Sequence, residues 1–461
     1  MLQHILSKKR AINLSGLISV LLLTSCTNAT VPPPSPPLKV KSTVSASIER
    51  APKNIIMVIA DGMGPAYTSA YRMYKDDPDT EELETTLFDD ILLGTVRTHP
   101  HPQSGYVTDS AASATAMAAG IKTYNGAIGM DVNKVVHRTV LHSAKEQGMK
   151  TGLAVTSTLV HATPASYMVA NERRRNYEQI ADSYFDDRIG GEFLADLMLG
   201  GGKQHFIRED RNLAQEFAAN GYQIIDSYDD LSTLKMGSPV LGLFADNGLP
   251  WSLDDSEANR LSVLTQTALE HLNNNKGFFL LVEASQVDWA GHGNDIASAM
   301  AEMDDLVATM QVIQMFANDN PDTLVLITAD HSTGGLTVAG EDGYRWDPVW
   351  IKGLSASIRT IANGLLTAND RGTYVSEQFG FQLNEQEIDS LVSINTEMSN
   401  RDIEDVLKRI LDQRTNTGWT TYGHTAVDVN MYGYGPGAHM FSGNLNNTDI
   451  ALKLFELLEE R

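Results

Sequence analysis

Three acidic residues each follow an apolar stretch that has the composition of a buried strand. They are Asp61 after residues 54–60, Glu283 after residues 278–282 and Asp330 after residues 323–329. One such carboxylate alone is most simply explained as a turn residue or a helix cap. Three that meet at one edge of a sheet would repel one another unless cations neutralise them. The sequence therefore predicts a metal-binding site at this edge.

Histidines accompany these acids. Asp288 and His292 follow the second apolar stretch closely. His331 directly follows the third carboxylate, and His424 lies in a glycine-rich stretch that suits a loop. Mixed imidazole and carboxylate ligands are typical of Zn²⁺, whereas sites made of oxygen ligands suit Mg²⁺.

Ser110 is the candidate nucleophile. The small residues of the run 108–116 predict a closely packed helix with Ser110 in its first turn. There the free backbone N–H groups and the helix dipole favour an anion. The same pattern also fits an ordinary helix cap, and the residues alone leave both interpretations open. No histidine adjoins Ser110 as a general base, so a metal ion would have to lower its pKa.

The elements that position these residues follow an α/β pattern. The near-continuous apolar stretches are typical of parallel strands that are buried on both faces. Residues 109–119, 256–274 and 295–316 have the pattern of crossover helices. An open, mostly parallel sheet binds its ligands beyond the carboxyl ends of its strands. The fold class that we predict is therefore α/β, with the site at that edge.

The composition describes a globular and acidic protein. The chain has 461 residues, of which 42% are hydrophobic, which excludes a disordered or coiled-coil protein. Its 58 acidic and 35 basic side chains give a net charge of −23 at pH 7. Because this charge repels a polyanion and no basic stripe interrupts it, we expect no nucleic-acid partner.

The N-terminus has the pattern of an export signal. A basic start and a short apolar run precede residues 23–26 (LTSC), which resemble the lipobox of bacterial lipoproteins. We expect removal of residues 1–25, lipidation of Cys26 and a proline-rich linker over residues 26–50. The protein would then be exported and anchored to the bacterial cell envelope, in the periplasm or at the outer membrane. An ordinary signal peptide with an incidental cysteine is the alternative.

Six motifs, taken in order, resemble the motif set of alkaline phosphatases, and their spacing is most similar to bacterial, marine-type members. They are residues 61–64 (DGMG), 108–116 (TDSAASATA), 161–165 (HATPA), 282–292 (VEASQVDWAGH), 328–331 (TADH) and 423–425 (GHT). The resemblance implies an alkaline-phosphatase-like three-layer sandwich with a mostly parallel central sheet and inserted segments. Residues 51–461 would form the catalytic domain. Residues 342–415 lack these motifs and would be an insertion near the active site or a subunit interface. Within this stretch the sequence predicts helices near 384–393 and 401–412.

The resemblance also implies a role for each site residue. Ser110 would be the phosphorylated nucleophile beside the metals, and Arg174 would bind phosphate, although Arg173 and Arg175 leave that choice open. One Zn²⁺ would be held by Asp288, His292 and His424, a second by Asp61, Asp330 and His331, and one Mg²⁺ by Asp61, Thr163 and Glu283. His161 and Trp289 replace an aspartate and a lysine of the enterobacterial pattern, so we expect His161 to reach Mg²⁺ through water.

The implied activity is hydrolysis of small phosphomonoesters through a phosphoserine intermediate, by an enzyme that is usually a homodimer. A related phosphodiesterase is an alternative, but it usually has a threonine nucleophile, and Ser110 argues against it. A sulfatase would need a C/S-x-P-x-R motif, which the sequence lacks. A non-catalytic lipoprotein that binds metal or phosphate would be expected to have lost its nucleophile or ligands, and every one of them is present.

Overall fold

A ten-stranded sheet forms the centre of the fold in the computed structural model, which describes residues 51–459 apart from 258, 341 and 396. The expected signal peptide, Cys26 and the linker lie outside the described residues. In spatial order the strands are β14 (Gly443–Asn446), β2 (Leu92–Arg97), β13 (Val429–Tyr434), β8 (Thr323–Thr328), β1 (Asn54–Ile59), β7 (Phe278–Glu283), β3 (Lys150–Thr158), β4 (Leu197–Gly201), β6 (Val240–Leu243) and β5 (Gln223–Ile225). Among the described strands of this sheet, only β13 runs antiparallel to its neighbours.

The three strands predicted from apolar stretches lie side by side at the centre of this sheet. β1 pairs in parallel with β8 on one side and with β7 on the other. Every residue of the three strands is buried. Strands covered on both faces need apolar side chains at successive positions, which is why the sequence reads as continuous hydrophobic runs.

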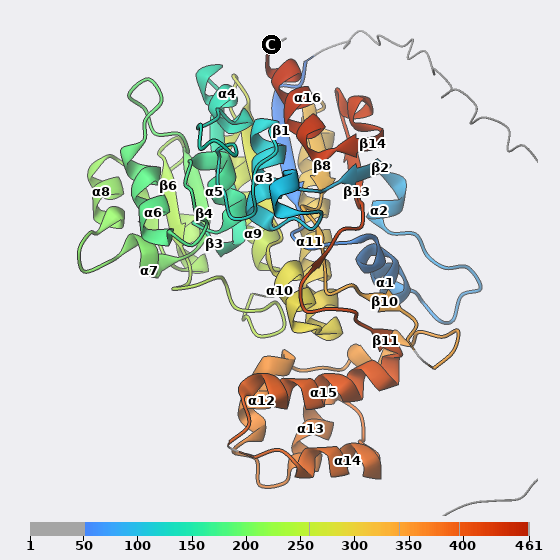
Figure 1. The fold of residues 1–461 in the computed structure, drawn as a ribbon. Coiled ribbons are helices and arrows are strands. Elements are labelled where there is room, and N and C mark those ends of the chain that lie inside the picture. The colour runs from blue at the N-terminus through green and yellow to red at the C-terminus, as the bar shows by residue number, and fades with distance from the viewer. Residues whose placement is uncertain (1–50, 258, 341, 396, 460–461) are drawn as a thin grey trace, which may run out of the picture. The chain divides into compact units, whose positions relative to one another are not determined.

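Helices cover both faces of the sheet, as Figure 1 shows. One layer consists of α3 (Ser110–Ala119), α4 (Val140–Glu146), α5 (Ala162–Met168) and α16 (Asn447–Glu459). The other consists of α1 (Pro65–Lys75), α9 (Arg260–Leu272) and α11 (Ile296–Asp319). The predicted three-layer α/β sandwich is confirmed, and α3, α9 and α11 lie where the sequence predicts crossover helices.

Shorter elements complete the body of the fold. They are α2 (Leu87–Asp90), α6 (Tyr177–Asp186), α7 (Lys203–Phe206), α8 (Leu213–Ala219) and α10 (Gln286–Gly293), with the two-stranded pairs β9 (Ser332–Thr333) with β12 (His424–Thr425) and β10 (Thr337–Val338) with β11 (Thr417–Gly418). The pairing of β9 with β12 corrects the expectation of a loop around His424. Two residues are too short to produce a periodic pattern in the sequence.

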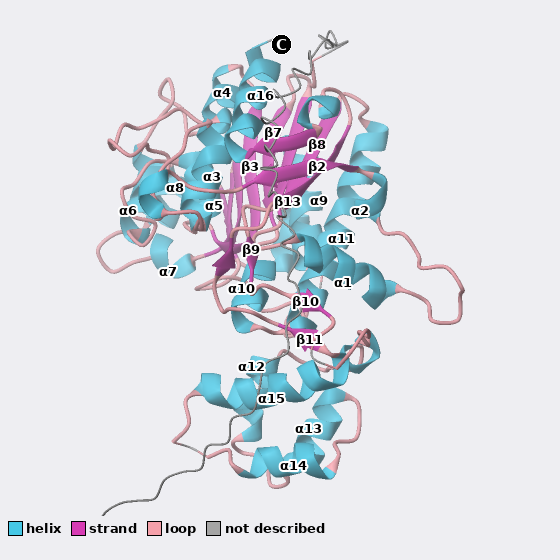
Figure 2. Ribbon diagram, turned by 45° about the vertical axis from the view of Figure 1, so that its right-hand side comes forward, coloured by secondary structure: helices cyan, strands magenta, loops and turns pink. Residues whose placement is uncertain are grey.

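A helical segment lies between β10 and β11 in the sequence. It contains α12 (Ile358–Leu365), α13 (Arg371–Phe379), α14 (Glu385–Val392) and α15 (Asn400–Thr415). These helices pack as a group of their own (Figure 2). The sequence predicts helices near 384–393 and 401–412, which match α14 and α15, but it misses α12 and α13.

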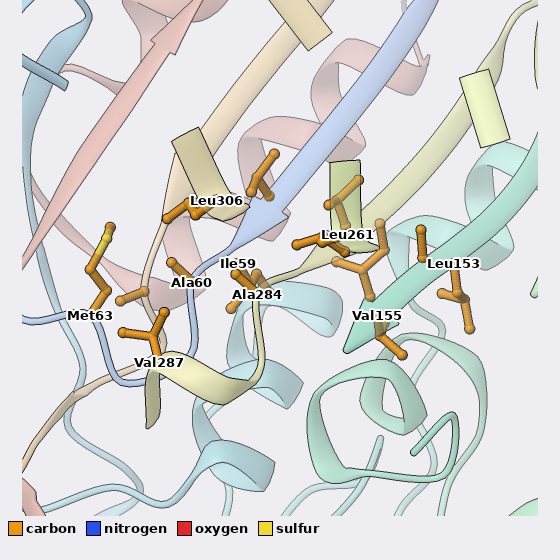
Figure 3. Packing of buried hydrophobic residues seen from close by; sticks show 14 of the residues in the cluster. Ile59, Ala60, Met63, Leu153, Val155, Leu261, Ala284, Val287 and Leu306 are labelled. Carbon is orange, nitrogen blue, oxygen red and sulfur yellow. The ribbon is translucent and has the colours of Figure 1, made fainter. Parts of the chain in front are cut away.

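The apolar core continues to the carboxyl ends of the central strands. Figure 3 shows Ile59 and Ala60 at the end of β1 close to Ala284 and Val287, which lie just beyond β7. All four side chains are buried. The polar residues that follow these strands therefore stand on a rigid apolar base. No helix of the described residues is long and apolar enough to cross a membrane.

Candidate active site

The three predicted carboxylates converge at the ends of neighbouring strands. Ile59, the last residue of β1, aligns with Thr328 of β8 and with Glu283 of β7. Asp61, Glu283 and Asp330 all have fully buried side chains. The strand register therefore delivers three acids to one edge of the sheet, as the sequence predicts.

Gly62 allows the end of β1 to approach α10 closely. Its φ is +78°, and a Cβ atom added there would lie 2.6 Å from the Cα atom of Asp288. Its N–H donates to Oδ1 of Asp330 at 3.1 Å. A larger residue would be strained at this φ, which suits glycine. Its Cβ atom would also push Asp288 away from the other acids.

Three overlapping groups of side chains place their ligand atoms within 4.8 Å of one another. The groups are Asp61, Asp330 and His331; Asp288, His331 and His424; and Asp61, His161 and Glu283. The first group matches the predicted second zinc site. In the second group His331 stands where the prediction has His292, but Nε2 of His292 lies only 3.1 Å from Nε2 of His424.

Several buried ligand atoms have no hydrogen-bond partner among the described residues. They are both carboxylate oxygens of Asp61, Oε1 of Glu283, Oγ1 of Thr163 and Nδ1 of His161. An unpaired buried polar atom costs about 1–3 kcal/mol, so such a cluster calls for a common partner. Carboxylates, imidazoles and a hydroxyl are suitable ligands for divalent cations, so the donor set fits the predicted metals.

The ionisation of the acids leads to the same conclusion. Burial, followed by the neighbouring carboxylates and that of Asp330 above all, raises the pKa of Asp61 well above its usual range. Burial also raises the pKa of Glu283 to about 8. Burial opposes ionisation of Asp330 as well, but the adjacent His331 holds the pKa of Asp330 below its usual range. A bound cation would allow all three acids to ionise.

Ser110 begins helix α3 and faces this cluster. The side chain of Asp109 caps the helix by accepting from the N–H of Ala112 at 3.0 Å. Ser110 is 1% exposed, and its Oγ lies 3.1 Å from Nε2 of His331. No histidine is next to Ser110 in the sequence, as expected, but one lies beside it in the folded chain. His331 reaches it from the end of β8.

The small residues of α3 fix its position over the sheet. All ten residues of this helix are buried. Ser113 donates from Oγ to the carbonyl of Asp330 at 2.7 Å, and Asn447 of α16 donates to the same hydroxyl at 3.0 Å. Alanine and serine therefore permit the close approach that brings Ser110 to the strand ends.

Arg174 bonds to Asp109, the residue directly before the candidate nucleophile Ser110. Its Nη1 donates to Asp109 at 3.1 Å, and its Nη2 lies 3.2 Å from Nε2 of His161. Arg173 and Arg175 are exposed. The geometry therefore favours the predicted choice of Arg174 over its two neighbours.

Carbonyl groups orient two of the predicted histidine ligands. Nδ1 of His424 lies 2.8 Å from the carbonyl oxygen of Thr108, and Nδ1 of His292 lies 2.5 Å from that of Tyr422. A ring that donates from Nδ1 keeps the lone pair of Nε2 for a ligand. Both Nε2 atoms face each other across 3.1 Å.

The sequence analysis misses two further residues that orient the acids. Thr333 donates from Oγ1 to Oδ1 of Asp288 at 2.5 Å and lies 3.2 Å from Nδ1 of His331. Ser157 donates from Oγ to Oε2 of Glu283 at 3.3 Å. Neither belongs to a recognisable motif. The one available signal is that Thr333 follows His331 by two residues.

Comparisons with known proteins identify the family. The family model for alkaline phosphatase matches residues 52–460. The chain belongs to the alkaline phosphatase family. It is 45% identical to alkaline phosphatase 3 of Bacillus subtilis (strain 168), over 88% of this chain and 89% of that protein.

Solved alkaline phosphatases share the fold. The crystal structure of a cold-active alkaline phosphatase from the psychrophile Shewanella sp. has a TM-score of 0.82 and 47% identity, and the match covers 88% of this chain and 99% of that one. A His-to-Asp mutant of TAB5 alkaline phosphatase with Mg bound in the M3 site has a TM-score of 0.67 and 26% identity, over 89% and 99%. The predicted family and enzyme class are confirmed. This alkaline phosphatase hydrolyses phosphate monoesters, and it belongs to a metal-dependent family.

Proposed function

We propose that this alkaline phosphatase transfers the phosphoryl group of its substrate to Ser110 and then to water, with two Zn²⁺ and one Mg²⁺ bound around it. The observation that carries the proposal is the position of Ser110 beside three overlapping ligand groups, several of whose buried oxygens lack partners. The serine nucleophile favours this activity over that of a phosphodiesterase.

The assignment of ligands follows the predicted sets. One Zn²⁺ would be held by Asp288, His292 and His424, the second by Asp61, Asp330 and His331, and Mg²⁺ by Asp61, Glu283 and Thr163. Mixed ligands support zinc at the first two sites, and the predominance of oxygen supports magnesium at the third. When bound, these cations would supply the positive charge that neutralises both the buried acids and a phosphoryl group.

The protein's own groups account for the rest of the reaction. Oγ of Ser110 gives up its proton and forms the new bond to phosphorus, while the ester P–O bond breaks opposite to it and the alcohol leaves with a proton from solvent. Arg174, held by Asp109 and His161, offers two parallel N–H groups to the phosphoryl oxygens. The N-terminus of α3 adds free backbone N–H groups at the same place. Hydrolysis of the phosphoserine then restores Ser110 and releases inorganic phosphate.

The protonation of His161 supports a contact with Mg²⁺ through water. Nε2 of His161 accepts from Arg174, and burial, then Arg174, lowers the pKa of His161 to about 3. The neutral ring therefore carries its proton on Nδ1, which is buried without a partner. An N–H group cannot bind a cation directly, so in this tautomer His161 would stand behind a water molecule and not in the coordination shell.

Replacing His161 by aspartate should strengthen the binding of Mg²⁺. The substitution adds a negative charge beside Asp61 and Glu283, and TAB5 alkaline phosphatase with a His-to-Asp substitution holds Mg in its M3 site. We expect the Mg²⁺ concentration for half-maximal reactivation after chelation to fall by about tenfold. His161→Asn is the neutral control and should not show this fall. An unchanged or higher Mg²⁺ requirement in His161→Asp would contradict the proposal that His161 lies next to the bound Mg²⁺.

Metal analysis combined with two substrates tests the proposed function. The purified enzyme should contain zinc and magnesium close to 2:1 and should hydrolyse 4-nitrophenyl phosphate. Hydrolysis of bis(4-nitrophenyl) phosphate should be slower by about 10³-fold or more, because Ser110 and Arg174 are arranged for a monoester dianion. A preference for the diester, or full activity without bound zinc, would contradict the proposal.

We also propose the finer organisation of the chain on sequence grounds. Residues 51–461 form the catalytic domain, with residues 342–415 inserted into it. Removal of residues 1–25 leaves Cys26 lipidated at the start of the linker 26–50, so that the exported enzyme is anchored to the cell envelope. The enzyme acts as a homodimer.

A further inference from the structure

A cavity of about 620 Å³ opens next to the proposed metal ligand His292. Its walls come from α10, from the chain around Trp251, and from helices α12 and α15 of the helical segment. The proposed reaction gives no role to this cavity or to the helical segment.

A row of contacting side chains connects Ser110 with the cavity. Ser110 lies 3.1 Å from His331, the His331 and His424 rings stack with centroids 3.5 Å apart, and His424 adjoins His292. This row of side chains runs from the nucleophile to the cavity. Because the leaving group of an in-line displacement departs opposite the nucleophile, it would leave toward His292.

Two tryptophans give one wall of the cavity an aromatic surface. The rings of Trp251 and Trp289 meet edge to face, with centroids 6.4 Å apart. Trp289 is packed tightly, since a Cβ atom on Gly248 would lie 2.4 Å from its ring. Tryptophan faces attract planar rings, and a ring that is already held in place loses little entropy on binding.

Cationic side chains also line the cavity. Arg359 lies 5.9 Å from the ring centroid of Trp251 and pairs with Glu404 at 3.4 Å. Arg401 lies 4.0 Å from the ring centroid of Tyr422, and it forms no ion pair with a carboxylate among the described residues. In a chain of net charge −23, such a cation beside the active site is well placed to bind a second anionic group.

Direct bonds fix the helical segment against the body of the enzyme. Ser357, which caps α12, donates from its N–H and its Oγ to Asp254 at 2.8 and 2.6 Å. Lys408 of α15 donates to the carbonyl of Gly293 at 2.6 Å. The side chains that line the cavity are therefore held in fixed positions relative to one another.

We propose that this cavity binds the leaving group of the substrate and selects phosphomonoesters whose leaving group combines a planar aromatic ring with a second negative charge. The ring lies against Trp251 and Trp289, and the charge pairs with Arg401. The inference rests on the proposed function, which supplies the position of the nucleophile. The helical segment is accordingly the specificity element of this enzyme.

Three substrates and two variants test the proposal. The substrates are glycerol 2-phosphate, phenyl phosphate and 4-carboxyphenyl phosphate, and each variant is compared with the wild type on the same substrate. Arg401→Gln should lower kcat/KM for 4-carboxyphenyl phosphate by roughly three- to fivefold and leave phenyl phosphate within about twofold. Trp251→Leu should lower kcat/KM for both aryl phosphates by about five- to tenfold and spare glycerol 2-phosphate. Arg345→Gln, which removes an exposed charge outside the cavity, should change none of the three.

Competitive inhibition provides a measurement that does not depend on the chemical step. Wild type should bind 4-carboxybenzylphosphonate more tightly than benzylphosphonate, and Arg401→Gln should abolish that difference. Equal losses on all three substrates, or unchanged ratios in both variants, would overturn the role of the cavity. A wild-type enzyme that hydrolyses none of the substrates would instead contradict the proposed function.

Discussion

Replacement of Ser110 by alanine should lower kcat for 4-nitrophenyl phosphate by about three to six orders of magnitude. The covalent phosphoenzyme trapped by acid quench from ³²P-labelled substrate should disappear, because the other described hydroxyl beside His331, that of Thr333, contacts Nδ1 and not Nε2. Zinc content should remain within error of the wild type, since the carboxylates and imidazoles of the three groups are untouched. Alanine also suits the first turn of α3, whose cap is Asp109.

Ser113→Ala is the matched control for this result. Ser113 lies in the same helix and is also buried, but its hydroxyl bonds to the carbonyl of Asp330 and not to His331. We expect this variant to form the phosphoenzyme, with a moderate loss of stability. Labelling that persists in Ser110→Ala at another residue would show that the nucleophile is wrongly assigned.

Asp61→Asn should separate the contribution of Asp61 to metal binding from the destabilising effect of burying this acid among other carboxylates. Asp61 belongs to two of the three ligand groups, so its replacement should lower both metal content and kcat, the latter by at least about 100-fold. With metals bound the wild type should be the more stable protein, and in excess chelator it should lose this advantage. The metal-free variant should melt no lower than metal-free wild type, because burial and the neighbouring carboxylates make the ionised form of Asp61 costly and asparagine has no proton to lose.

The pH dependence of the free energy of unfolding, measured on the metal-free enzyme, also tests the cost of burying these acids together. The pKa of Glu283 is about 8 in the folded chain and 4.5 ordinarily. Between these values the folded state binds more protons than the unfolded state, so the free energy of unfolding falls as the pH rises. The raised pKa of Asp61 adds to this slope, and Asp61→Asn should flatten it.

The partly exposed acid Asp304, paired with Lys75 at the surface, provides the control for Asp61→Asn. Asp304→Asn should keep its metals and its activity. If metal-free Asp61→Asn melts several degrees below metal-free wild type, repulsion among the buried acids does not limit the stability of the metal-free fold.

The parts of this fold that the sequence predicts are those encoded locally. Continuous apolar stretches identify β1, β7 and β8, and an acid at or beyond each end identifies the edge where the site forms. Small residues around Ser110 identify α3, because they too form a local pattern in the sequence. Each pattern lies within a dozen neighbouring residues, so no knowledge of the tertiary structure is needed to recognise it.

Contacts between distant segments could not be predicted in this way. The approach of His331 to Ser110 joins residues 221 positions apart and depends on the order of strands in the sheet. Arg174 is predicted from the family resemblance, but its bond to the cap residue Asp109, which distinguishes it from its neighbours, has no local pattern in the sequence. The aromatic and cationic side chains that line the cavity likewise come from four separate parts of the chain.

The strand order has a consequence for how the chain folds. β1 comes first among the described strands, yet both of its partners, β7 and β8, come more than two hundred residues later. A growing chain therefore carries an apolar strand with two unpaired edges until its partners have been made, which is a hazard for aggregation. His424 follows later still, so the set of ligands is completed almost at the end of synthesis. The early, vulnerable states of this protein must thus persist without the stabilisation that bound cations give the finished fold.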